Sequence, residues 1–380
     1  MLFHKDLVVL FLCGDVMTGR GIDQVLPHPG DPRLFESYLR DARDYARLAR
    51  GAGSSIPARV DFTYIWGDAL AELERMAPDA RIVNLETAVT RSDDAWPHKG
   101  INYRMHPANL PVLAAARIDV ATLANNHVLD WGYDGLRETL DVLRKADIKS
   151  AGAGGDLAEA EAPAVVETGG KGRVLVLAAG DRSSGIPAEW AAAPQRPGVH
   201  RLEDLSDRAA RRIASLLQAF RQPDDLVVLS IHWGGNWGWE IPRAHKQFAH
   251  RLIDDAGVDV VYGHSSHHVK GIEVYRDQLI LYGCGDFIND YEWIKGYEEF
   301  RGDLGLMYFV HLEPATGKLA GLKMIPTRIR DYSLIRASHA ETIWLCDMLN
   351  REGKNLGTRV ECLEDNTLAL RWDEREAHIQ

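Results

Sequence analysis

Residues 7–20 read LVVLFLCGDVMTGR, an apolar run that ends in Gly14 and Asp15. Seven apolar residues suit a buried strand and fall far short of the roughly 20 that a membrane-spanning helix needs. A strand that ends in Gly-Asp presents a carboxylate at the carboxyl edge of a sheet, which is where α/β proteins bind their ligands. This stretch therefore predicts an α/β fold with a functional site beside Asp15.

The composition is that of a soluble globular protein, with 46% of the 380 residues hydrophobic and 26% charged. The formal net charge of −11 gives no electrostatic support to a nucleic-acid partner. No apolar segment is long enough to span a membrane, and the N-terminal run lacks the cleavage site of a signal peptide. We therefore expect a cytoplasmic protein that binds neither nucleic acid nor membrane. The cysteines are scattered and form no C-x-x-C pair, which argues against disulfides and a thiolate metal site.

Strand-length apolar runs recur along the chain, with amphipathic helical patterns between several of them. The expected strands are 7–13, 81–85, 120–123, 174–178, 226–231 and 258–262. Helices are expected over 135–148 and 242–257, and the second has Pro242 at its start and Gly257 at its end. Strands that alternate with helices indicate an α/β fold whose sheets are covered by helices.

The later part of the chain changes to strands that pair locally. Segments 272–283 and 306–326 each read as a hairpin. The tail from about residue 338 predicts one more helix and a final strand pair over 359–372. Segment 40–61, which contains a Gly/Ser stretch, is expected to be a loop-containing insertion.

Polar side chains follow the expected strands where each strand ends. They are Asp15, Asn84, Glu86, Asn125, Asn126, His127, Asp130, His232, His264, His267, His268, Asp286, Asn289 and Asp290. Buried imidazoles, amides and carboxylates are costly without partners, so their convergence on one sheet edge implies a polar ligand among them. A metal cation is the simplest candidate. Histidine with carboxylate and amide oxygens suits a divalent ion such as Zn, Mn, Fe, Mg or Ca.

Five motifs carry a resemblance to a known family. They are GDVMTGR at 14–20, NLET at 84–87, NNHVLDWG at 125–132, HWGG at 232–235, and GHSSHHVKGIEVY at 263–275 with GDF at 285–287. In this order they resemble the CapA family, which is named for poly-γ-glutamate capsule synthesis and belongs to the calcineurin-like metallophosphoesterase superfamily. The resemblance runs from about residue 8 to 310. It implies a two-sheet β-sandwich flanked by helices, with a metal site at one edge. We expect this domain over 1–335 and a C-terminal helix and strand extension over 336–380, packed on the same domain.

Several positions depart from the superfamily pattern. Met17 stands where the first strand usually carries the histidine of Asp-x-His, and Glu86 stands where a bridging aspartate is usual. Asn-Asn-His-Val replaces Gly-Asn-His-Glu, and Gly-His-Ser-Ser-His has one residue more than Gly-His-x-His. A two-metal centre needs enough ligands to hold ions roughly 3.5–4 Å apart. These changes predict a single divalent cation, with Ca, Mg or Mn favoured over a Zn or Fe pair.

Residue type suggests a role for each candidate. The candidate ligands of the metal or its waters are Asp15, Glu86, Asn126, His127, His232 and His264. The candidates for proton transfer or its orientation are His127, Asp130, Asp15, His264, His267 and Asp286, and these assignments could exchange. Trp233 and Trp237 could line an aromatic subsite for the substrate, or pack their loop against the sheet. Arg20 and Arg104 could grip a substrate carboxylate, or form ordinary surface pairs.

Three functions remain open. Histidine–aspartate couples beside a cation suit inversion at a carbon, because a base on one face and an acid on the other are what epimerisation requires. In its CGDFINDY stretch at 284–291 and in lacking a membrane segment, the chain also resembles the cytosolic lasso-peptide epimerases, which implies a peptide substrate and inversion at Cα of its C-terminal tryptophan. We therefore expect a metal-dependent peptide epimerase. The alternatives are a metal-dependent phosphoesterase or amide hydrolase, and a non-catalytic accessory protein of poly-γ-glutamate metabolism.

Overall fold

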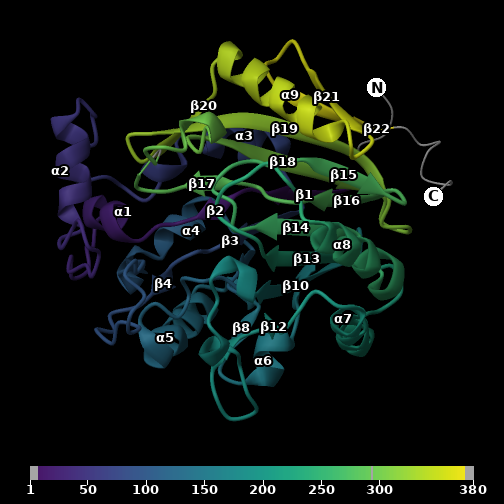
Figure 1. Cartoon of the computed structure of the whole chain (residues 1–380), viewed down its shortest axis with the longest axis horizontal. Coiled ribbons are helices and arrows are strands. Elements are labelled where there is room, and N and C mark those ends of the chain that lie inside the picture. Colours follow the sequence, from purple (N-terminus) through teal and green to yellow (C-terminus); the bar gives the residue numbers. More distant parts are fainter. Residues whose placement is uncertain (1–6, 292–293, 373–380) are drawn as a thin grey trace.

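The computed structural model describes residues 7–291 and 294–372, and its first apolar run forms β1 (Val8–Leu12) inside a nine-stranded sheet (Figure 1). The strands of this sheet are, in spatial order, β21 (Thr358–Cys362), β22 (Leu368–Trp372), β19 (Leu319–Arg330), β18 (Leu304–Leu312), β1, β3 (Ala80–Asn84), β6 (Val120–Thr122) and β7 (Lys149–Ala151), with β20 (Ser333–Arg336) paired to β19. β1 runs parallel to β3 and antiparallel to β18. The sheet therefore joins the parallel N-terminal strands to the antiparallel hairpins of the C-terminal part.

The second sheet has seven strands. In spatial order they are β12 (Arg201–Leu202), β10 (Arg173–Asp181), β13 (Leu226–His232), β14 (Val260–His264), β16 (Gln278–Leu281) and β15 (Ile272–Tyr275), with β9 (Ala164–Glu167) paired to β10. β10, β13, β14 and β16 run parallel, so their carboxyl ends share one edge. β14 extends two residues beyond the expected strand, because its last residue, His264, pairs in register with His232 of β13.

Both faces of β10 are buried, which explains its unbroken apolar sequence. Val174 and Val176 belong to the core that also contains β1, between the two sheets. Leu175 and Leu177 belong to the core formed with α7 (Asp207–Phe220) and α8 (Arg243–Ala256). A single strand thus contributes alternate residues to two separate cores.

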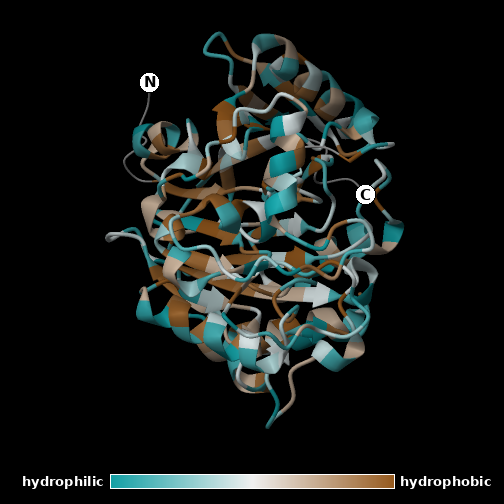
Figure 2. Ribbon diagram, turned by 90° about the vertical axis from the view of Figure 1, so that its left-hand side faces the viewer, coloured by the Kyte–Doolittle hydropathy of each residue, from teal (hydrophilic) through white to brown (hydrophobic). Residues whose placement is uncertain are grey.

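The two sheets pack face to face and helices cover their outer faces, as the brown interior and teal helix surfaces of Figure 2 show. Phe11 and Val83 point away from the other sheet into a core shared with α3 (Ala69–Met76), α4 (Pro111–Ala115) and α5 (Gly132–Lys145). The expected α/β class and two-sheet sandwich flanked by helices are therefore confirmed.

The remaining elements are short or lie at the edges. They are α1 (Arg20–Val25), α2 (Arg43–Gly51), α6 (Leu157–Glu161) and α9 (His339–Gly353), and the strand pairs β2 (Asp15–Val16) with β17 (Asp286–Ile288), β4 (Ala88–Val89) with β5 (Arg104–Met105), and β8 (Ala153–Gly154) with β11 (Gly198–Val199). The segment expected to be an insertion contains α2 followed by non-helical chain. α8 begins after Pro242 and ends at a left-handed Gly257, as the sequence predicts. Within the described part of the chain, every helix is too short or too polar to cross a lipid bilayer.

Candidate metal centre

The candidate site lies where the two sheets meet at their carboxyl ends. β2 continues β1 and pairs in parallel with β17, which places Asp15 beside Asp286. This pairing requires glycine at position 14, because a Cβ there would meet Gly285 O at 2.1 Å. Asp15 N donates to the same oxygen at 2.8 Å. The Gly-Asp that ends the first strand is thus fixed by a second Gly-Asp far along the chain.

Three buried side chains converge as a possible metal-binding triad. One ligand atom from each of Asp15, Glu86 and His232 lies within 4.8 Å of the others. Glu86 Oε1 is 3.8 Å from His232 Nε2, which is too long for a hydrogen bond. That spacing fits two ligands of one ion, since each ligand atom would lie about 2.0–2.2 Å from the metal.

Buried polar atoms without partners support a ligand in this place. Asp15 Oδ2, His232 Nδ1 and His264 Nε2 accept or donate no hydrogen bond within the described part of the chain. Buried polar atoms are nearly always paired in folded proteins. Carboxylate oxygens with imidazole nitrogens are a donor set that divalent cations accept. The residues present therefore fit a metal ion.

Asp15 is held as an anion by its neighbours. His264 Nδ1 donates to Asp15 Oδ1 at 2.6 Å, and Asn84 Nδ2 donates to the same oxygen at 2.8 Å. Burial alone would raise the pKa of Asp15, but the attraction and hydrogen bond of His264 and the attraction of His232 outweigh it and leave that pKa below the ordinary value. Asp15 is therefore ionised at neutral pH.

Glu86 has the opposite electrostatic environment. Burial, followed by the repulsion of Asp15 and Asp286, holds the pKa of Glu86 well above the ordinary value, and Lys99 offsets only part of this. Asn84 Nδ2 donates to Glu86 Oε2 at 3.2 Å. Two carboxylates that are buried close together repel one another when both are ionised. A divalent cation bound between them would neutralise this repulsion.

Asn126 and His127 reach the triad from the loop after β6. Asn126 Oδ1 lies 3.2 Å from His232 Nε2, and His127 Nε2 lies 3.9 Å from Glu86 Oε1. Asn125, the residue before them, donates to Asn84 Oδ1 and accepts from His127 N, which fixes this loop against β3. Both predicted ligands of this loop thus lie against the triad.

His127 is also oriented by charged groups behind it. Its Nδ1 donates to Asp130 Oδ2 at 2.7 Å, and Lys99 Nζ pairs with Asp130 Oδ1 at 2.8 Å. Burial lowers the pKa of His127 to about 4, despite the attraction of Asp130. Burial likewise lowers the pKa of His232 to about 3. Both imidazoles are therefore neutral at neutral pH, which is the form that binds a metal.

A second histidine–aspartate couple lies on the Asp286 side. His267 Nδ1 donates to Asp286 Oδ1 at 2.9 Å, and Tyr291 Oη donates to Asp286 Oδ2 at 2.5 Å. Burial alone would lower the pKa of His267, but Asp286 and Asp15 raise it above the ordinary value. Met17 Sδ lies 4.0 Å from Tyr291 Oη. The side chain of Met17 therefore lies beside the hydroxyl of Tyr291 at this end of the site.

The four predicted substrate-binding residues occupy different environments. Arg20 is buried, and its guanidinium donates to Glu36 Oε1 at 2.9 Å and to Asp290 Oδ1 at 2.5 Å. Arg104 donates to the main-chain oxygens of Ser92 and Asp31 and lies 3.7 Å from the ring centre of Trp131. Both guanidinium groups therefore already bind groups of the protein.

The two tryptophans differ from one another. Trp233 is buried, stacks on His245 with the ring centres 4.5 Å apart, and donates from Nε1 to Tyr282 O. Trp237 is half-buried and lies 5.5 Å from His267, ring centre to ring centre. Trp237 is thus the indole that contacts a candidate proton-transfer residue.

Sequence reasoning did not find Lys99 and Tyr291, which contact four of the predicted residues, His127, Asp130, His267 and Asp286. Lys99 precedes the short strand β5 in a segment without any motif, so no local pattern marked it. Tyr291 directly follows Asn289 and Asp290, two of the polar residues that the sequence singled out. That adjacency was the available signal.

The amino-acid sequence is similar to those of several known proteins. Residues 9–291 match the family described as "Bacterial capsule synthesis protein PGA_cap". The chain is 47% identical over 368 residues to the "probable polyglutamine synthesis accessory protein" of Mycobacterium tuberculosis strain H37Rv, and the match covers 97% of both chains. It is 27% identical over 294 residues to the "PGA biosynthesis protein CapA" of Bacillus subtilis, which covers 77% of this chain and 66% of that one. It is also 27% identical over 197 residues to the "capsule biosynthesis protein CapA" of Bacillus anthracis, covering 52% and 46%.

Proposed function

The chain belongs to the PGA_cap family of bacterial capsule synthesis proteins, and on this premise we propose that it is an accessory protein in the synthesis of a polymer of amide-linked glutamate or glutamine residues. The names of its relatives support this role more directly than peptide epimerisation. The mycobacterial relative matches over nearly the whole chain, so the accessory role would belong to the whole fold rather than to a shared fragment.

The observation that carries a chemical role is the buried triad of Asp15, Glu86 and His232. A non-catalytic scaffold has no need of two carboxylates and an imidazole buried together with unpartnered atoms. We infer that a divalent cation binds there and that the protein cleaves or trims amide links of the polymer. A bound cation would act as a Lewis acid toward a carbonyl oxygen and lower the pKa of water.

The chain's own residues could supply the proton transfers of such a hydrolysis. Asp286 raises the pKa of His267, so this imidazole holds a proton near neutrality and could give it to the leaving nitrogen as the C–N bond breaks. Water supplies the new C–O bond, and one of its protons returns to His267. Asp286 and Tyr291 keep the ring of His267 in place throughout.

Peptide epimerisation is the second candidate. Two separate histidine–aspartate couples, His127–Asp130 and His267–Asp286, could provide a base and an acid. None of the relatives named above carries an isomerase name.

The test uses the purified protein with Mn²⁺ and a γ-glutamate polymer of defined length, followed by size-exclusion chromatography. We expect metal-dependent shortening by the wild type and none by Glu86→Gln. Polymer binding without shortening would retain the accessory role and remove the hydrolysis. Absence of binding and shortening would overturn the proposal. Deuterium uptake from D₂O into Cα of a peptide, lost in Asp286→Asn, would favour epimerisation instead.

A further inference from the structure

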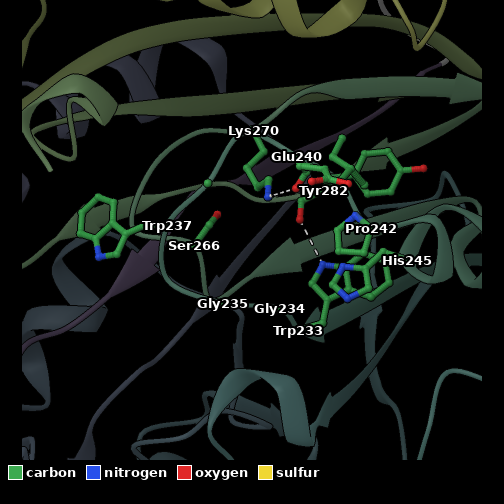
Figure 3. A pocket seen from close by; sticks show the side chains of 12 residues that line it. Trp233, Gly234, Gly235, Trp237, Glu240, Pro242, His245, Ser266, Lys270 and Tyr282 are labelled. Carbon is green, nitrogen blue, oxygen red and sulfur yellow. Dashed lines mark hydrogen bonds between the residues drawn. The ribbon is translucent and has the colours of Figure 1, made fainter.

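A cavity of about 360 Å³ lies between the loop after β13 and the loop after β14. Its lining includes Trp233, Trp237, Ser266 and Lys270 from these loops, and His245 from the first turn of α8 (Figure 3). Trp233 directly follows the triad residue His232, and Ser266 lies two positions after His264. The two loops that line the cavity therefore directly follow the strands that end in the candidate metal ligands His232 and His264.

Lys270 is the cation of this cavity. Figure 3 shows its side chain reaching the main-chain oxygen of Glu240, to which Nζ donates at 2.8 Å. None of the carboxylates in the described ranges forms an ion pair with Lys270, although Glu240, which lines the same cavity, and Glu352 both attract it. Burial lowers the pKa of Lys270 to about 8, so most of its ammonium groups still carry their charge at neutral pH. His245 carries no charge at neutral pH, because burial and the nearby Lys270 lower its pKa to about 4. An ammonium with one neutral acceptor retains two N–H groups for an incoming anion.

The first turn of α8 adds to this positive environment. Ile241, Pro242 and His245 line the cavity at the point where the helix begins. No side chain caps this end, and its first turn contains no acidic residue. The positive end of the dipole of this 14-residue helix therefore lies beside the cavity.

The remaining lining suits an extended, partly apolar chain. Trp233, His245 and Pro242 lie together at one end of the cavity, and Trp237 lies at the other (Figure 3). Gly235 and Gly238 have open space where a Cβ would stand, so a ligand can approach the main chain closely. We propose that this cavity binds a carboxylate of an amide-linked acidic chain, with Lys270 as its counter-ion and the indole of Trp237 against its methylene groups.

This inference rests on the proposed function for its substrate and extends it with a specificity site. It assigns recognition of a free carboxylate to Lys270, and it therefore distinguishes a glutamate chain from a glutamine chain. A charge-assisted hydrogen bond in a half-buried place favours the carboxylate over a neutral amide. The position of the cavity, beside the loops of the triad, would hold one residue of the chain while a neighbouring amide lies at the metal centre.

The experiment measures binding of a γ-glutamate pentamer and of the matching γ-glutamine pentamer by calorimetry, with wild type, Lys270→Met and Lys270→Arg. Lys354→Met, on the exposed surface after α9, serves as the matched control. We expect Lys270→Met to weaken glutamate pentamer binding roughly tenfold or more. Lys270→Arg should retain much of it, and binding of the glutamine pentamer should be unchanged in every variant. Metal content should stay equal to that of the wild type.

A second measurement needs no variant. Reductive methylation of lysines, read by mass spectrometry, should label Lys270 in the free protein and label it less in the presence of the glutamate pentamer or glutarate. Equal pentamer binding by wild type and Lys270→Met would overturn the inference and leave the proposed function standing. Protection by glutarate without pentamer binding would overturn the polymer function and retain a carboxylate site. Absence of protection by both ligands would overturn the site itself.

Discussion

His264 Nδ1 lies 2.6 Å from Asp15 Oδ1, although 249 positions separate the two residues in the chain. Asp15 continues the central strand of the nine-stranded sheet, and His264 ends a parallel strand of the other sheet. The contact therefore joins the two sheets inside the candidate metal centre. The same contact lowers the pKa of Asp15 and so keeps its carboxylate ionised. The charge of the site therefore depends on how the two sheets pack.

Glu86→Gln should abolish metal binding, because it replaces a carboxylate of the triad by a neutral amide of similar shape. Elemental analysis should give close to one equivalent of a divalent metal for the wild type and less than about a tenth for the variant. Glu138→Gln, a change to a glutamate on α5 away from the triad, is the control. Unchanged metal content in Glu86→Gln would remove Glu86 from the ligand set.

The same substitution should stabilise the metal-free protein at alkaline pH. The pKa of Glu86 is raised on folding, so the folded chain holds a proton that the unfolded chain releases above its ordinary pKa near 4.5. The free energy of unfolding therefore falls as pH rises from that value toward the raised pKa. Glu86→Gln has no carboxylate at this position and does not lose stability in this way. Its melting temperature should therefore change less between pH 6 and pH 8 than that of the wild type.

Metal affinity should increase with pH. A proton on Glu86 competes with the cation, whereas His232, whose pKa is lowered to about 3, is already neutral and adds no competition. The rise should approach about tenfold per pH unit until Glu86 is ionised in the free protein. Mn²⁺ titrations at pH 6, 7 and 8 measure it, and buffers of different ionisation enthalpy should reveal one released proton. An affinity independent of pH would contradict the raised pKa.

Asp286→Asn should lower the pKa of His267. Asp286 is the main group that raises this pKa against the effect of burial. In the wild type, the pairing stabilises the fold below the ordinary pKa near 6.5 and its contribution is lost as pH rises through the raised value. NMR titration of the His267 ring measures the shift, with Asp134→Asn on the exposed face of α5 as the control. An unchanged titration would show that Asp286 does not govern His267.

Gly14→Ala should destabilise the fold, because the new Cβ would meet Gly285 O at 2.1 Å and push β2 away from β17. We expect a loss of about 1–3 kcal/mol in the free energy of unfolding. Gly51→Ala is the matched control, since nothing lies within 4 Å of its Cβ position. Denaturant unfolding of both variants measures the difference, and equal stabilities would show that β2 can move without cost.

The sequence by itself determined the strands, the α/β class and the family. Apolar runs such as that of β10 are local signals, because a parallel strand buried on both faces must be apolar throughout. The motif order also predicted a metal site with six candidate ligands, since residue types and their order are visible in the chain. The structure brings three of them, Asp15, Glu86 and His232, together as a possible metal-binding triad.

Only the tertiary structure decided which distant groups share the site. Lys99 enters beside His127 and Asp130, Tyr291 orients His267, and Lys270 lines a cavity with Trp237. Lys99 lies in a segment without a motif, and periodicity indicates only which face of one element is buried, so the local sequence does not show which side chains these residues contact. Which side chains meet depends on sheet register and on how the two sheets pack, and these are set by contacts between residues far apart in the chain.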